Sequence, residues 1–158
     1  MNAIHVHLIV NHVPIIATWL AVPLLVLALA RLPNRDTWLS AMLLLVVAGG
    51  SGAATLWTGE AAEEAIEGYP GIEEARLEEH EGRGKIGAGA TLAAGVLALG
   101  AWALGTRASS RRAPRAAVAA TLVIAVVSGS VLAWVGYSGG LIRHPEILGR
   151  ESGPSARE

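Results

Sequence analysis

The sequence predicts an all-α membrane protein, built as a bundle of four transmembrane helices. Apolar residues make up 53% of the 158 residues and charged residues only 16%, whereas a soluble domain is usually about a quarter charged. Mean hydropathy is correspondingly high, at +0.48. Four long stretches contain no Asp, Glu, Lys or Arg, and each is close to the ~20 residues that a helix needs to cross ~30 Å of hydrocarbon. Buried core helices have shorter apolar stretches, so this pattern indicates membrane spans.

The predicted spans are residues 13–30, 37–58, 86–106 and 116–137. In the first span, Pro14 suits the first helical turn, with Asn11 as its N-cap. Pro23 lies in the middle of the same span, where we expect it to kink the helix. The span ends in a sequence that resembles a signal-peptide cleavage site, but no basic residue precedes it. We therefore interpret it as a retained helix.

The segment between the second and third spans, residues 59–85, is predicted to form a helical outer loop. Residues 59–67 and 72–81 both have helical composition, and a Tyr-Pro-Gly sequence separates them. This loop holds most of the acidic residues of the chain, which we interpret mainly as a solvated face. The four-helix transmembrane domain is expected to cover residues 1–148, and residues 149–158 are expected to form a polar C-terminal tail.

Basic residues indicate the orientation of the bundle. The connection between the first two spans carries Arg31 and Arg35, and the connection between the last two carries four more arginines, Arg107, Arg111, Arg112 and Arg115. Both connections should face the cytoplasm under the positive-inside rule. The acidic outer loop and both termini should then be periplasmic, with the protein in the cytoplasmic (inner) membrane of a bacterium.

Small residues are frequent within the predicted spans. The third span places glycines and a threonine at helical spacing below His80, namely Gly84, Gly87, Thr91 and Gly95. Membrane helices associate through close packing of small residues, and packing alone explains this pattern. The same stripe would also leave room for a flat macrocycle below the histidine.

All five histidines lie outside the spans, and the predicted topology places them on one side of the membrane: His5, His7, His12, His80 and His144. Imidazole is the commonest metal ligand and a frequent axial ligand of haem iron. We favour His12 and His80 as axial ligands of a haem b, because they precede the first and third spans; His7 and His144 are the alternatives. In a second interpretation, the histidines bind a zinc, copper or iron ion together with Glu60, Glu63 or Glu146.

Several classes of function are disfavoured by what the chain lacks. The chain has no cysteine, which excludes disulfides, thiolate metal sites, cysteine-ligated iron–sulfur clusters and covalent c-type haem. No ionisable residue lies in the middle of a span, whereas pumps and secondary transporters need such groups. No hydrolase or nucleophile motif is present, so a metal-dependent enzyme with an open coordination site ranks last. Nothing indicates a nucleic-acid partner.

Four groups of residues form a recognisable set in chain order. They are Ala3-Ile4-His5-Val6-His7-Leu8 with Asn11-His12-Val13-Pro14, Thr58-Gly59-Glu60-Ala61-Ala62-Glu63-Glu64, Tyr69-Pro70-Gly71-Ile72 with Glu79-His80-Glu81, and Gly139-Gly140 with Ile142-Arg143-His144-Pro145-Glu146-Ile147. This set resembles a family of small, uncharacterised four-helix bacterial membrane proteins with a His-rich outer face, itself loosely similar to four-helix b-type cytochromes. The resemblance covers nearly the whole chain. It implies that the site residues are His5, His7, His12, His80, His144 and Glu60.

These observations lead to two hypotheses from different classes. The first is a membrane protein that binds haem or a metal ion through its periplasmic histidine cluster and serves electron transfer. The second is a non-catalytic accessory subunit of a larger respiratory or photosynthetic membrane complex, in which the histidines only make hydrogen bonds. The expected partners are the lipid bilayer and, in either case, other subunits of a membrane electron-transfer complex. An electron carrier or accessory subunit is expected rather than a stand-alone enzyme.

Overall fold

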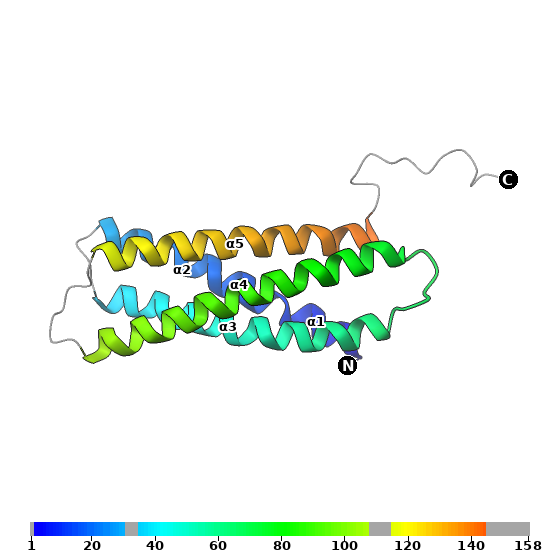
Figure 1. Ribbon diagram of the computed structural model, residues 1–158, viewed down its shortest axis with the longest axis horizontal. Coiled ribbons are helices and arrows are strands. Elements are labelled where there is room, and N and C mark those ends of the chain that lie inside the picture. The colour runs from blue at the N-terminus through cyan, green and yellow to red at the C-terminus, as the bar shows by residue number, and fades with distance from the viewer. Residues whose placement is uncertain (1, 31–34, 108–114, 145–158) are drawn as a thin grey trace.

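The computed structural model describes residues 2–30, 35–107 and 115–144, and within these ranges the chain is helical with no strand (Figure 1). The helices are α1 Ala3–Val10, α2 His12–Ala30, α3 Arg35–Glu64, α4 Glu74–Arg107 and α5 Arg115–Arg143. Helices α1 and α2 follow one another almost without interruption, so the described chain forms four rods. All four rods are long and apolar enough to cross a membrane. The predicted all-α, four-helix architecture is confirmed.

The helices extend beyond the predicted spans, and most of the predicted outer loop belongs to them. Helix α3 continues to Glu64 and α4 begins at Glu74, which leaves only residues 65–73 as a connection. Alanine and glutamate are good helix formers, so nothing in the sequence ends α3 earlier. Gly68 and Gly71 have positive φ angles of 73° and 84°, a conformation that residues with a Cβ atom rarely adopt. The two glycines therefore make the turn between the helices.

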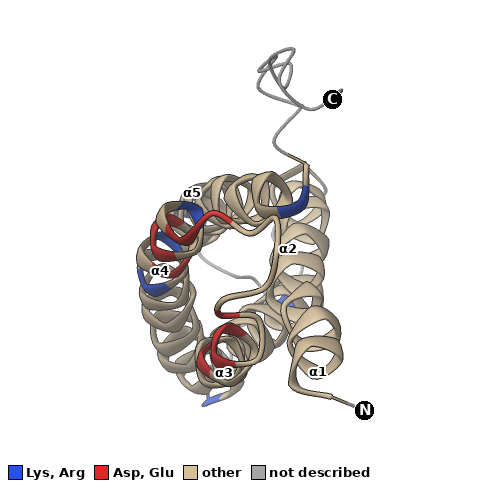
Figure 2. Cartoon of the chain, turned by 90° about the vertical axis from the view of Figure 1, so that its right-hand side faces the viewer, with Lys and Arg blue, Asp and Glu red and all other residues tan. Residues whose placement is uncertain are grey.

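The four rods pack in a ring. Helix α2 contacts α3, α3 contacts α4, α4 contacts α5, and α5 returns to α2; helix α1 continues the first rod and packs mainly against α3. The first rod and α4 are therefore diagonal partners, as the view along the bundle shows (Figure 2). One half of the bundle has a continuous apolar core, which includes Ala21, Leu25, Trp38, Met42, Leu45 and Val118.

Helices α3 and α4 approach each other closely at Gly49 and Gly95. A Cβ atom added to Gly49 would lie 3.0 Å from Gly95 Cα, and one added to Gly95 would lie 3.0 Å from Gly49 Cα. The two backbones are thus in close contact, which the absence of a Cβ atom in both glycines favours. Gly95 of the predicted glycine stripe therefore serves packing. Gly84 of the same stripe has open space around it, with no heavy atom within 4 Å of an added Cβ.

The first rod is interrupted at Asn11, and the role predicted for this residue is wrong. Asn11 has helical φ and ψ angles and ends α1, where its backbone N–H donates to the His7 carbonyl oxygen. It is therefore a C-cap and not the N-cap of α2. The interruption follows from Pro14, which has no N–H to donate to the Val10 carbonyl oxygen. Thr55 Oγ1 of α3 donates to the Ser51 carbonyl oxygen of its own helix at 2.9 Å and lies 3.5 Å from the Val10 carbonyl oxygen.

Glutamates lie at one end of the described bundle, whereas basic residues lie at both ends. One end consists of α1, the last turns of α3, the first turns of α4 and the last turns of α5; we call it the histidine end, because the described part of the chain has all its histidines there. Acidic residues of α3 and α4 gather at the same end (Figure 2). They are exposed, apart from the half-buried Glu63 and Glu81, in agreement with the expected solvated face.

At the opposite end, two arginines join neighbouring helices. Arg35 Nη2, at the start of α3, donates to the Thr106 carbonyl oxygen near the end of α4 at 2.9 Å. Arg115 Nη2, at the start of α5, donates to the Leu29 carbonyl oxygen near the end of α2 at 3.4 Å. Both guanidinium groups thus satisfy carbonyls that a helix end leaves without partners. The other arginines on which the predicted orientation rests, Arg31, Arg111 and Arg112, lie outside the described residues, as do Glu146 and the predicted tail 149–158.

Candidate functional site

A cavity of ≈ 470 Å³ lies at the histidine end, between the rods. Its volume falls within the ~300–1,000 Å³ that is usual for small-molecule and cofactor sites. Most of its lining is apolar or glycine, from Ile4 in α1 to Ile142 in α5. Three histidines, His7, His12 and His80, are part of the lining, together with Glu60, Glu63, Glu81 and Arg143. The fold therefore brings imidazoles from both diagonal rods to one cavity.

His7 is half-buried in α1 and is fixed by α3. Its Nδ1 lies 3.3 Å from Thr58 Oγ1. The Thr58 hydroxyl donates its proton to main-chain carbonyl oxygens of its own helix, those of Ala54 and Thr55. It can therefore only accept from His7, so Nδ1 carries the imidazole proton. The His7 ring also packs on Gly59, where an added Cβ would lie 3.3 Å from His7 Cε1.

His80 is half-buried in α4 and is fixed by α5 in the same way. Its Nδ1 lies 3.0 Å from Ser138 Oγ. Ser138 Oγ donates to the Val135 carbonyl oxygen at 2.7 Å, so its single proton is used and Nδ1–H of His80 is the donor. The ring packs on Gly139, where an added Cβ would lie 2.9 Å from His80 Cε1.

His12 is exposed at the start of α2 and lines the cavity. Its Nδ1 lies 2.5 Å from the Leu8 carbonyl oxygen. A carbonyl oxygen only accepts, so here too Nδ1 carries the proton. In a neutral imidazole with a protonated Nδ1, Nε2 keeps its lone pair. We therefore assign the proton of all three lining histidines to Nδ1, the tautomer in which Nε2 can bind a metal. An Nδ1–H bond to a protein oxygen is the usual support of such a ligand.

The other predicted site residues fall in different places. His5 is exposed, does not line the cavity, and its Nδ1 lies 2.7 Å from Asn2 Oδ1, which caps α1. His144 is exposed just beyond α5 and is also outside the lining. Glu60 is in the lining. Within residues 2–30, 35–107 and 115–144, no three His, Asp or Glu side chains come together in a group that could hold a metal ion.

Asn11 adds a polar group to the cavity. Its Oδ1 is buried and has no hydrogen-bond partner among the described residues, and the residue lines the cavity. Buried polar groups are normally paired. An amide can present either its oxygen or its NH₂ group, so Asn11 suits an occupant with a polar edge.

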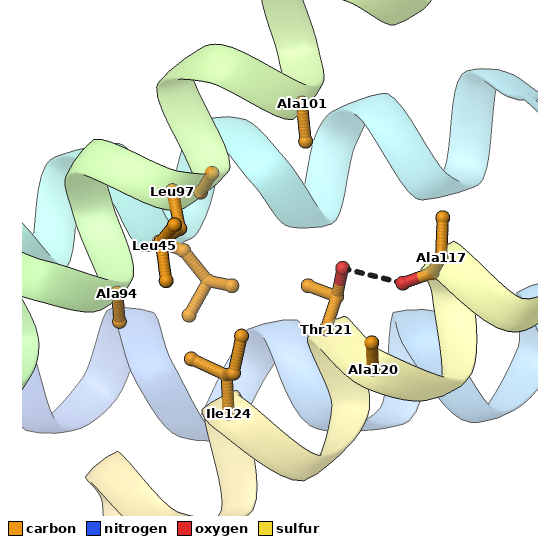
Figure 3. A pocket seen from close by; sticks show the side chains of 9 residues that line it. Leu45, Ala94, Leu97, Ala101, Ala117, Ala120, Thr121 and Ile124 are labelled. Carbon is orange, nitrogen blue, oxygen red and sulfur yellow. Dashed lines mark hydrogen bonds between the residues drawn. The ribbon is translucent and has the colours of Figure 1, made fainter.

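A second, smaller cavity of ≈ 220 Å³ lies between α3, α4 and α5 and has no such chemistry (Figure 3). Leu45, Leu97 and Ile124 line it together with several alanines. Its hydroxyl group, on Thr121, donates to the Ala117 carbonyl oxygen of its own helix at 2.8 Å. The ligand-binding chemistry of the described residues is therefore concentrated at the histidine end.

Two anchoring residues, Thr58 and Ser138, were not predicted from the sequence. Each is an ordinary hydroxyl residue of an apolar helix, and its role depends on which helix packs beside it. A signal was nevertheless present, because each is followed by a glycine in a short hydroxyl-glycine sequence near the end of its helix, Thr58-Gly59 and Ser138-Gly139. The glycine stripe below His80 was the more visible pattern.

The fold and the cavity together define a small protein of four apolar helices with an imidazole-lined cavity at one end. No protein-family model, no curated protein and no solved structure matches the chain. Its function is therefore argued from the residues of the cavity.

Proposed function

We propose that this protein binds haem b in the cavity at the histidine end and serves electron transfer in the cytoplasmic membrane of a bacterium. The observation that carries the proposal is shared by three lining histidines: Nδ1 of His7, His12 and His80 each lies within hydrogen-bond distance of a protein oxygen, which leaves Nε2 for a ligand. A bound haem supplies a one-electron couple at its iron, and histidine is a common axial ligand.

The rest of the lining fits a haem as well. The macrocycle is flat and mostly apolar, and the cavity walls are largely apolar side chains and glycines. Gly84, Gly136 and Gly140 line the cavity without a heavy atom within 4 Å of an added Cβ, so they leave space for a flat group. Arg143 and Asn11, also in the lining, suit the two carboxylates of a haem.

The arginines beside the two short connections support the predicted orientation. Arg35, Arg107 and Arg115 lie at the end opposite the histidines, near Asp36, whereas the histidine end carries the glutamates together with the basic residues Arg76, Arg83, Lys85 and Arg143. Under the positive-inside rule, we expect the end with the two short, arginine-bearing connections to face the cytoplasm. The cavity then opens on the periplasmic side, where we expect electrons to be exchanged with a partner.

A haem is better supported than the alternative of a zinc, copper or iron ion. A closed metal-ion site needs three or four protein ligands, whereas a haem iron already has four nitrogen ligands from the macrocycle and needs one or two imidazoles. Two diagonal rods supply these imidazoles, and His7 and His80 line the same cavity. This placement supports His7 beside the expected His12 as the partner of His80.

The experiment that tests the proposal is an absorption spectrum of the detergent-purified protein, oxidised and then reduced, with metal analysis of the same sample. We expect a Soret band that shifts on reduction and about one iron per chain. A colourless sample with stoichiometric zinc or copper would replace haem by a metal ion. A sample with neither, which co-purifies with a large complex, would favour the accessory subunit.

Filling the cavity should prevent haem binding without unfolding the bundle. Gly136 lines the cavity, and an added Cβ meets no atom within 4 Å. In Gly136→Leu, the side chain occupies space that the haem needs, so we expect the haem content to fall at least ~10-fold, while helix propensity improves by ~0.8 kcal/mol. The matched control is Gly100→Leu, which has the same open surroundings outside this cavity. Equal haem content in both variants would place the haem elsewhere.

A further inference from the structure

The two halves of the chain repeat one another in sequence. Four positions of α3 recur at the same intervals in α5. Arg35, Gly49, Thr58 and Gly59 correspond in order to Arg115, Gly129, Ser138 and Gly139. In the first rod and α4, a second set matches at equal intervals: His7, Thr18 and Ala21 correspond to His80, Thr91 and Ala94. The buried positions follow the same pairing, because Thr18, Ala21, Thr91 and Ala94 are all buried.

The contacts repeat as well as the residues. Arg35 binds the end of α4, and Arg115 binds the end of α2. His7 contacts the hydroxyl and the glycine of Thr58-Gly59, and His80 contacts those of Ser138-Gly139. Thr55 and Val135, which occupy equivalent positions of α3 and α5, both line the cavity. Two helical hairpins, α1–α3 and α4–α5, are thus arranged about a pseudo-two-fold axis along the bundle.

We infer that Thr58 and Ser138 are equivalent positioning residues, which hold His7 and His80 in one tautomer as the two axial ligands of a single haem. The inference rests on the proposed function and adds the ligand pair and the residues that orient it. His12 has no histidine counterpart in the second hairpin, since Lys85 occupies the equivalent position. The pseudo-symmetry therefore separates His7 and His80 from the other three histidines.

The chemistry of the anchors gives them a measurable role. A hydrogen bond from Nδ1–H to an oxygen raises the basicity of Nε2 and fixes the orientation of the ring. Loss of such a partner typically weakens metal binding ~10- to 100-fold. It also makes the imidazole a poorer electron donor, which favours reduced iron. Removal of either hydroxyl should therefore weaken haem binding and make the midpoint potential more positive.

The test uses the full chain in detergent with Thr58→Ala and Ser138→Ala. In the haem-free protein, ¹⁵N NMR of the imidazoles should report protonated Nδ1 for His7 and His80. Thr58→Ala should change only the His7 tautomer, and Ser138→Ala only that of His80. After haem is added, each Ala variant should bind it ~10- to 100-fold more weakly, with a more positive potential. Thr58→Ser and Ser138→Thr exchange the hydroxyl residues of the two hairpins and should behave like the wild type.

Ser130→Ala is the matched control, because Ser130 is exposed on α5 and bonds only the Val126 carbonyl oxygen of its own helix. Circular dichroism confirms that each variant is folded. Haem binding with unchanged tautomers and potential in both Ala variants would overturn the positioning role and leave the proposed function intact. A wild-type protein that binds no haem would overturn the proposed function and, with it, the ligand role of His7 and His80.

Discussion

The His80→Ala variant is expected to purify without haem. His80 is the half-buried imidazole of α4 in the cavity lining, and its Nδ1 is held 3.0 Å from Ser138 Oγ. Removal of the ligand itself should cost more than the ~10- to 100-fold loss of affinity that follows removal of a ligand's hydrogen-bond partner. The measurement is the reduced-minus-oxidised difference spectrum per mole of protein. Free imidazole added during haem loading should restore the spectrum, because the small molecule can replace the missing side chain.

The control for this prediction is His5→Ala. His5 is a histidine of the same cluster, but it is exposed and lies outside the cavity lining. The haem content of His5→Ala should equal that of the wild type. The haem content of His7→Ala should be as low as that of His80→Ala. A full haem content in His80→Ala, or equal losses in His5→Ala and His80→Ala, would rule out the cavity as the haem site.

The Gly49→Ala variant is expected to lose stability, although alanine is the better helix former. An added Cβ would lie 3.0 Å from both Gly95 Cα and the Thr91 carbonyl oxygen. These are backbone atoms, so α3 and α4 must separate at this contact. Overpacking of this kind typically costs ~1–3 kcal/mol. The measurement is the free energy of unfolding from a titration with sodium dodecyl sulfate in mixed micelles.

Gly50→Ala isolates the packing effect. Gly50 is the next residue of the same helix, and an added Cβ has no heavy atom within 4 Å. The change from glycine to alanine should stabilise the helix by up to ~1 kcal/mol, so Gly50→Ala should equal or exceed the wild type in stability. If Gly49→Ala is as stable as Gly50→Ala, the two backbones are not in contact.

The number and type of the helices could be predicted from the sequence because a charge-free apolar stretch of this length rarely forms anything other than a membrane-spanning helix. The helix ends could not. The predicted spans ended where charges began, at Thr58 and at Ile86, but the helices continue into the acidic segment to Glu64 and from Glu74. A membrane limits the length of an apolar stretch, whereas a helix ends only where its backbone hydrogen bonding does.

The candidate site was predictable in its location but not in its construction. The distribution of the histidines predicted one cluster at one end, and the described part of the chain has all of them there. Within that cluster, His7, His12 and His80 line the cavity and His5 does not. This division depends on the break at Asn11 and on the contacts of α1 with α3. The anchors Thr58 and Ser138 depend in turn on helix register, which a single sequence does not reveal.

The pseudo-two-fold arrangement has a consequence for the ancestry of the chain. A single hairpin with one histidine, one hydroxyl-glycine pair and one arginine at its turn could form the same site as a homodimer, with each subunit contributing one ligand. Duplication and fusion of its gene would join the two copies and free them to diverge. Pro14 and His12 in the first hairpin correspond to Gly87 and Lys85 at the equivalent positions of the second. Such an origin would account for a site whose two sides are built alike but differ at these positions.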